Sequence, residues 1–193
     1  MPHPTPLLRS CLLVGLLLSV AAAQNTASRK PLDVPYVPTT EEAVQAMLKL
    51  ADVKPSDTVY DLGCGDGRIV IAAARQFRAH GVGIDIDPTR IREAKENAQK
   101  AQVASMVKFE ENDLFQADIR PATVVTLFLL PNINIKLKPK LLADLKPGTR
   151  IVSNTFDMGD WKPEKEATVG GDDDDTFLSH RLYLWIVPER TGK

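Results

Sequence analysis

The chain has 193 residues, a formal net charge of −1, 44% hydrophobic residues and 25% charged residues. These values are ordinary for a globular protein that is large enough to form a stable core alone. They argue against a nucleic-acid-binding protein, because no basic stripe dominates the sequence.

The first 23 residues have the features of an export signal. Arg9 precedes a short apolar run from Cys11 to Val20, and three alanines then offer a small-residue cleavage site. The run is shorter than the roughly 20 residues needed to span a bilayer. We therefore expect residues 1–23 to be a signal peptide and the protein to be exported, either periplasmic or secreted. The alternative is an uncleaved membrane anchor, and in both cases only this segment would contact a membrane.

Residues 24–35 are polar and contain prolines, which predicts a linker or arm, and residues 36–193 are expected to form one domain. A helix is expected from about Thr40 to Leu50, because Thr39 and Glu42 have the spacing of a capping box and apolar residues follow at helical intervals.

A glycine-rich turn organises the next part of the chain. An apolar, β-branched run ends around Asp61, Gly63, Gly65 and Gly67 follow, and an alanine-rich helix begins directly afterwards. Such a strand–loop–helix unit brings backbone close to a ligand at a helix amino terminus. The spacing differs from the dinucleotide fingerprint, and the carboxylate of Asp61 would repel a pyrophosphate.

The following predicted strand, residues 82–86, carries Asp85 about 20 residues beyond the loop, where a carboxylate would hold ribose hydroxyls. The two features together favour a cationic adenosine cofactor that contains no phosphate.

Strands and helices alternate along the rest of the chain. The sequence predicts further strands at 106–110, 122–130, 149–154, 176–179 and 182–187, and helices at 88–101 and from about Pro139. This alternation predicts an α/β fold with right-handed crossovers.

Three motifs in the expected order resemble those of class I S-adenosylmethionine-dependent methyltransferases. Residues 61–67 resemble the first motif, residues 83–85 the second, whose acid holds the ribose, and residues 112–115 the third, which places an acid against the adenine amino group. The resemblance implies S-adenosylmethionine as the cofactor. It also implies a Rossmann-like, doubly wound, seven-stranded sheet that is mostly parallel with an antiparallel final strand. The expected cofactor-binding residues are Tyr36, Asp61, Gly63, Gly65, Gly67, Asp85, Asp113 and Leu114.

Four segments, 36–39, 61–70, 112–115 and 152–161, resemble more closely the small lysine methyltransferases that modify mitochondrial membrane proteins, such as the ATP synthase c subunit. The implied acceptor is a protein lysine. Residues 129–132, Leu-Leu-Pro-Asn, depart from the Asn/Asp-Pro-Pro-Tyr pattern of enzymes that methylate adenine, cytosine or glutamine. Asn132 is our candidate catalytic residue, as the group that orients the acceptor; a helix cap or turn is its structural alternative.

Other features have two interpretations each. The acidic run 172–175 is either a solvated loop or a site for a lysine-rich substrate or a hard cation. Trp161 either walls the acceptor pocket or packs in the core. Neither His80 nor His180 has partners at metal-ligand spacing, so no metal is expected. We expect a monomer and no nucleic-acid partner.

An exported methyltransferase would lack an obvious supply of a cofactor that is made in the cytosol. The alternative function is therefore a non-catalytic exported domain that binds S-adenosylmethionine, adenosine or a partner protein. The retained acids Asp61, Asp85 and Asp113 argue against it.

Overall fold

The computed structural model describes residues 36–170 and 180–190, together with Met1. The chain divides into two units, Met1–Pro31 and Leu32–Lys193, and all the described helices and strands belong to the second. The expected signal peptide, the arm at 24–35, the acidic run 172–175 and the expected strand at 176–179 lie outside the described residues. Within the described part of the chain, no helix is long and apolar enough to cross a membrane.

The described residues form one seven-stranded sheet with the strand order β3-β2-β1-β4-β5-β7-β6. Its strands are β1 (Thr58–Leu62), β2 (His80–Asp85), β3 (Val107–Glu111), β4 (Val124–Leu127), β5 (Arg150–Asn154), β6 (Lys165–Val169) and β7 (His180–Ile186). The first five are parallel to one another, and β7 pairs antiparallel with both β5 and β6. The chain reverses its winding between β1 and β4, which opens a crevice at the carboxyl ends of these strands. The predicted fold is confirmed.

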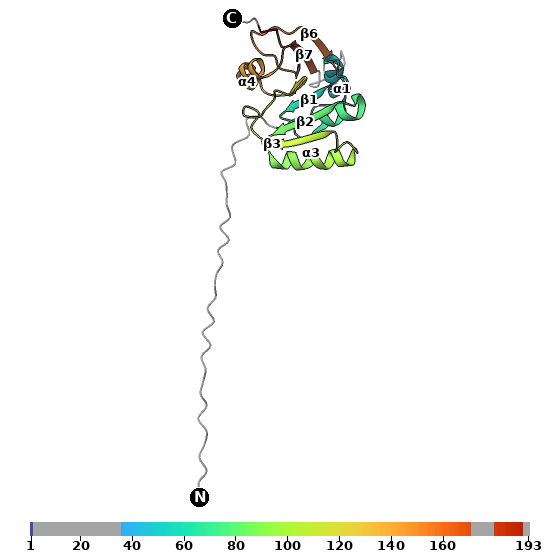
Figure 1. The fold of residues 1–193 in the computed structure, drawn as a ribbon, viewed down its shortest axis with the longest axis vertical. Coiled ribbons are helices and arrows are strands. Elements are labelled where there is room, and N and C mark those ends of the chain that lie inside the picture. Colours follow the sequence, from blue (N-terminus) through green and yellow to red (C-terminus); the bar gives the residue numbers. More distant parts are fainter. Residues whose placement is uncertain (2–35, 171–179, 191–193) are drawn as a thin grey trace. The chain divides into compact units, whose positions relative to one another are not determined.

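Helices cover both faces of the sheet (Figure 1). They are α1 (Glu41–Leu50), α2 (Arg68–Ala72) with its π-helical continuation η1 (Ala73–Phe77), α3 (Pro88–Lys100) and α4 (Pro131–Asp144). Residues of α1, α2 and α3 share one buried cluster, and residues of α4 belong to the other. The side chains of successive residues of β1 point to opposite faces of the sheet, since Val59 lies in the first cluster and Tyr60 in the second.

Two predicted details were wrong, and one strand was not predicted. The amino-terminal cap of α1 is Thr40, not Thr39, because the Thr40 hydroxyl accepts the amide of Ala43 at 3.2 Å. The last helix begins at Pro131 and not near Pro139, which lies inside it. Proline is tolerated in the first turn of a helix because the N–H that it lacks would have no partner within the helix. The strand that pairs with β7 at the edge of the sheet is Lys165–Val169.

Candidate cofactor pocket

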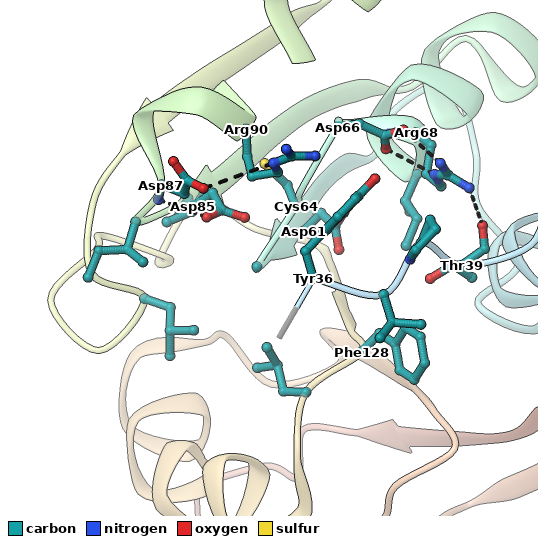
Figure 2. A pocket seen from close by; sticks show the side chains of 18 of the residues that line it. Tyr36, Thr39, Asp61, Cys64, Asp66, Arg68, Asp85, Asp87, Arg90 and Phe128 are labelled. Carbon is teal, nitrogen blue, oxygen red and sulfur yellow. Dashed lines mark hydrogen bonds and ion pairs between the residues drawn. The ribbon is translucent and has the colours of Figure 1, made fainter. Parts of the chain in front are cut away.

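A pocket lies where β1, β2 and β4 end, beneath the segment that precedes α1 (Figure 2). Its lining comes from five parts of the chain: residues 36–39, the loop after β1, the end of β2, the segment after β3 and the end of β4. The lining residues are Tyr36, Val37, Pro38, Thr39, Asp61, Gly63, Cys64, Asp66, Arg68, Ile69, Ile84, Asp85, Ile86, Asp87, Arg90, Asn112, Asp113, Leu114, Phe128 and Leu129.

The glycine loop turns sharply at the end of β1. Gly63, Gly65 and Gly67 have φ angles of +84°, +51° and +80°, in the region that other residues rarely adopt. A Cβ atom on Gly67 would lie 2.9 Å from the Cβ of Ala94, so the missing side chain lets α2 approach α3. The loop therefore needs glycine both for its conformation and for close packing.

Asp85 connects the second motif to the first. Its Oδ2 accepts the amide of Gly65 at 2.8 Å, and its Oδ1 accepts the amide of Asp87 at 2.9 Å. The end of β2 is thereby fixed against the glycine loop, with the carboxylate on the pocket wall. Lone pairs left over on this carboxylate would suit two neighbouring hydroxyl groups, as on a ribose.

Asp61 lines the pocket from the end of β1 and is only 3% exposed. Its Oδ1 accepts the hydroxyl of Thr126 on the neighbouring strand β4 at 2.8 Å. Burial raises the pKa of Asp61 to about 7. The nearby charges of Asp85 and Asp66 raise the pKa as well, whereas the hydrogen bond from Thr126 lowers it. A positive group in this pocket would favour the ionised carboxylate.

The segment before α1 is held across the mouth of the pocket by Arg68. Its guanidinium forms a two-point pair with Asp66, at 2.9 and 2.7 Å, and donates to the carbonyl of Thr39 at 2.6 Å. The pairing with Arg68 outweighs the effect of burial and lowers the pKa of Asp66. Figure 2 shows Tyr36 between this group and Arg90, whose guanidinium carbon lies 4.5 Å from the centre of the tyrosine ring.

The third motif lines the pocket after β3. The amide of Asn112 donates to the carbonyl of Asp85 at 2.9 Å, which holds this segment beside the end of β2. The Asp113 side chain accepts the amide of Phe115 at 3.0 Å, and both Asp113 and Leu114 face the pocket. All eight residues expected to bind the cofactor are thus brought to one region, since Gly65 and Gly67 shape the loop and the other six line the pocket.

Asn132 lies elsewhere. It is exposed on the first turn of α4 and is not among the lining residues, so its orienting role stays a prediction. The carbonyl of Leu130 accepts the amides of Ile133 and Asn134 at the start of this helix. The buried amide on α4 is Asn134, whose Nδ2 donates to the Ser153 hydroxyl at 3.1 Å.

Two other residues have structural roles. Burial raises the pKa of the Cys64 thiol well above its usual range, which keeps the sulfur protonated. Trp161 packs against Trp185, with ring centroids 6.1 Å apart, and its carbonyl accepts the indole N–H of Trp185 at 2.7 Å. Trp161 is thus partly buried against the core and does not line the cofactor pocket.

Three further groups that shape the pocket, Arg68, Arg90 and Phe128, are not among the site residues expected from the sequence. Each reaches the pocket through tertiary packing, which the local sequence pattern does not encode.

The charge of the pocket limits what it can bind. Five carboxylates line it, and two guanidinium groups, Arg68 and Arg90, face them. Arg68 is already paired with Asp66, and Arg90 with Glu93 at 2.7 Å. An excess of negative charge disfavours a pyrophosphate and favours a cation, such as the sulfonium and amino groups of S-adenosylmethionine. The residues present therefore fit this group, which supplies an activated methyl group when bound.

Fold and pocket together define a class I S-adenosylmethionine-dependent methyltransferase. The model of the ANTKMT methyltransferase domain matches residues 61–165, and the chain belongs to this family.

Relatives and solved structures agree with this assignment. The chain is 47% identical to a protein-lysine N-methyltransferase of Saccharolobus islandicus, over 81% of this chain and 95% of that protein. It is 35% identical to the adenine nucleotide translocase lysine N-methyltransferase of Mus musculus, over 68% of this chain and 57% of the mouse protein. A crystal structure described as an RNA methyltransferase from Salinibacter ruber, in complex with S-adenosyl-L-homocysteine, matches with a TM-score of 0.74 and 50% identity, over 81% of this chain and 97% of that one.

The chain is accordingly an enzyme that uses S-adenosylmethionine, rather than the non-catalytic domain that was the alternative. The similar structures solved with S-adenosylhomocysteine, the product left after methyl transfer, come from methyltransferases that share this fold.

Proposed function

We propose that this enzyme N-methylates a lysine side chain of a protein. The observation that carries the proposal is the 47% identity to a protein-lysine N-methyltransferase over 95% of that protein's length. The mouse relative that is named for the adenine nucleotide translocase is a lysine N-methyltransferase as well, and it is 35% identical over 68% of this chain.

The electrostatics of the pocket support a cationic acceptor. Lysine arrives as an ammonium ion, which the carboxylate-rich lining would attract. An RNA acceptor would bring phosphates to the same mouth, where the carboxylates would repel them. The protein has no excess of basic residues to offset this repulsion, since its formal net charge is −1.

We assign three positioning tasks to the pocket residues. Asp85 would hold the ribose, Asp113 with Leu114 the adenine, and Asp61 the amino group of the cofactor. The segment from Tyr36 to Thr39 would cover the ligand and exclude water. Aligning acceptor and methyl group in a dry site is the main contribution that an enzyme makes to a direct displacement.

The first test is calorimetric titration of the full chain with S-adenosylmethionine, S-adenosylhomocysteine and NAD. We expect the two sulfur nucleotides to bind with micromolar dissociation constants and NAD not to bind.

The second test is methyl transfer from tritiated S-adenosylmethionine to a bacterial cell extract. We expect label in protein, resistant to ribonuclease and recovered as methyllysine after hydrolysis, and much less label with the Asp85→Ala variant at a subsaturating concentration of the cofactor. Label that ribonuclease removes would instead support the function named for the Salinibacter ruber structure and end the lysine proposal.

We also propose that the protein is exported, with cleavage after residue 23, and that it is a monomer. The short apolar run and the three alanines before Gln24 support cleavage. Expression of the full chain in a bacterium, followed by fractionation and amino-terminal sequencing, should give a periplasmic protein that begins at Gln24. An uncleaved protein in the membrane fraction would support the anchor instead. Light scattering of the purified protein measures its oligomeric state.

A further inference from the structure

Buried polar atoms without partners gather at the end of β5. Among the described residues, three buried side-chain atoms have no hydrogen-bond partner: Asn134 Oδ1, Asn154 Nδ2 and His180 Nε2. Asn154 is the last residue of β5, His180 is the first residue of β7, and Asn134 donates to the carbonyls of Phe156 and Asp157 in the turn after β5. Unpaired buried polar groups are costly and rare, so three around one turn call for an explanation.

The backbone of the same turn is strained. Thr155, directly after β5, has a φ angle of +68°, which is an outlier for a β-branched residue. Its amide donates to the carbonyl of Arg181 at 2.7 Å, and its hydroxyl donates to Asn154 Oδ1 at 3.0 Å. Strain of this kind persists where surrounding structure enforces it, and it gathers at functional sites.

The cluster of Asn154 and His180 adjoins the cofactor pocket through Phe128. This ring follows β4 and lines the pocket, and it meets the imidazole of His180 edge to face, with centroids 6.3 Å apart. In parallel α/β sheets ligands bind outside the carboxyl ends of the strands, and both Phe128 and Asn154 lie at such ends. The imidazole is therefore one aromatic ring away from the pocket that would hold the methyl donor.

The hydrogen bonds define the protonation of the imidazole. Asn154 Oδ1 lies 3.0 Å from His180 Nδ1 and is an acceptor, so Nδ1 carries the proton and donates. Nε2 is then left with a lone pair that no described group uses. Burial lowers the pKa of His180, which favours the neutral imidazole at neutral pH, although Glu42 opposes the shift.

We propose that His180 Nε2 takes a proton from the lysine ammonium of the acceptor, with Asn154 holding the imidazole in the required tautomer. This role rests on the proposed lysine specificity. In the step, one N–H bond of the ammonium breaks and its electron pair stays on nitrogen as the nucleophilic lone pair. The proton bonds to Nε2, His180 becomes an imidazolium, and it later returns the proton to solvent.

The step is needed because lysine has a pKa of about 10.4, so fewer than about one molecule in a thousand is the free amine at pH 7. The surroundings of His180 are suited to a base that changes charge. Glu42 on α1 would stabilise the imidazolium. Phe128, which follows β4, and Asn154, which ends β5, contact the ring and are uncharged. Val169 of β6, which pairs with His180 in the sheet, is uncharged as well.

The pH dependence of methyl transfer to poly-L-lysine tests the role of His180. We expect His180→Gln to lower kcat about 100-fold at pH 7 with little change in KM. The deficit should shrink about tenfold for each pH unit above 7, because free amine then comes from solution. S-Adenosylhomocysteine affinity should not change. His80→Gln, at the exposed start of β2, is the matched control and should behave as the original protein.

Two outcomes would overturn the proposal. A loss of kcat of the same size at every pH in His180→Gln would show that His180 only supports the fold.

Nitrogen NMR of histidine-labelled protein, saturated with S-adenosylhomocysteine and titrated with n-butylamine, gives an answer without turnover. The Nε2 resonance of His180 should shift while that of His80 does not, and Asn154→Ala should alter the tautomer. No shift at His180 would reject the proposal even if lysine methylation is observed, whereas a failure of all lysine methylation would reject the proposed function itself.

Discussion

The ring of Tyr36 lies directly on the backbone of Gly65. A Cβ atom built on Gly65 would be 2.3 Å from Cε2 of Tyr36 and 2.9 Å from its Cδ2. The contact joins the segment before α1 to the glycine loop, and the same loop residue donates its amide to Asp85. The segment before α1 and the end of β2 therefore both contact Gly65 of the glycine loop, and the first contact requires that this residue has no side chain.

Gly65→Ala should displace Tyr36 and weaken S-adenosylmethionine binding at least tenfold, because the new methyl group and the ring cannot occupy the same space. Calorimetry measures the affinity. Gly148→Ala is the matched control, since Gly148 also has a positive φ of +81° but no atom within 4 Å of the added carbon. Both variants carry a backbone cost of about 1–2 kcal/mol, so the control shows how much of the loss comes from a lower stability of the whole fold. Equal loss of affinity in the two variants would refute a specific role for the Tyr36–Gly65 contact.

Asp85→Ala should weaken S-adenosylmethionine binding at least tenfold, which corresponds to about 1.4 kcal/mol, because charged hydrogen bonds to the ribose would be lost. The variant also leaves the amides of Gly65 and Asp87 without their acceptor. Asp85→Asn keeps one oxygen acceptor and should lose less. Titration calorimetry compares the two with Asp118→Ala, an exposed acid paired with Arg120 that should bind the cofactor normally. An unchanged affinity in Asp85→Ala would remove this residue from the site.

The parts of the site that the sequence predicted are those encoded by short spacings. Asp61, the three glycines and Asp85 follow one another within a single strand–loop–helix–strand unit, and the parallel sheet brings their ends together. Asn154 and His180 are 26 residues apart and meet only because β7 returns antiparallel beside β5. No local pattern in the sequence identifies such a pair.

Edge and boundary errors have physical reasons as well. The strand β6 has the sequence Lys-Glu-Ala-Thr-Val and is mostly exposed at the edge of the sheet, so it lacks the apolar run that identified β4. Neighbouring threonines at positions 39 and 40 both have cap chemistry. Thr40 is the cap because its carbonyl accepts the amide of Val44, the first hydrogen bond of the helix, and its hydroxyl accepts the amide of Ala43.

Asp57→Ala should lower the free energy of unfolding by about 3 kcal/mol, because it removes the carboxylate partner of the largely buried Arg150 guanidinium, which then keeps only the carbonyls of Ala51 and Asp52. Asp57 is 5% exposed and pairs with Arg150, and it also accepts the Thr123 hydroxyl and the Lys54 amide, each at 2.7 Å. Denaturant unfolding measures the loss, with Asp118→Ala as the exposed control that should change little. Similar stabilities for the two variants would contradict the prediction.

The same carboxylate should make stability depend on acid. Burial alone would raise the pKa of Asp57, but its bonds from Thr123, Lys54 and Arg150 lower the pKa below its usual 3.8. The unfolded state therefore binds the proton more readily, so the contribution of Asp57 is complete above about pH 4 and is lost as the pH falls further. Denaturant unfolding at pH 7 and at pH 3 measures this effect. The difference in the free energy of unfolding between Asp57→Ala and the original protein should be smaller at pH 3.

Asp61 should have the opposite effect on stability, and it should make cofactor binding depend on pH near neutrality. Burial raises its pKa from 3.8 to about 7, so the folded state binds the proton more tightly than the unfolded state does. Its contribution to stability is favourable at low pH and is lost as the pH rises from about 4 to 7. A cationic ligand prefers the ionised carboxylate, so affinity for S-adenosylmethionine should be about tenfold weaker at pH 6 than at pH 8, as the ionised fraction requires.

Calorimetric titrations of the original protein and Asp61→Asn across this range measure the effect of Asp61 on binding. The asparagine variant keeps the size of the side chain and still offers an oxygen to the Thr126 hydroxyl, but it cannot titrate. Its affinity should be uniformly weak and should lack the tenfold change between pH 6 and pH 8. The same change in affinity in Asp61→Asn would assign the titration to the ligand or to another carboxylate of the pocket. It would also remove the argument that Asp61 binds the cofactor in its charged form.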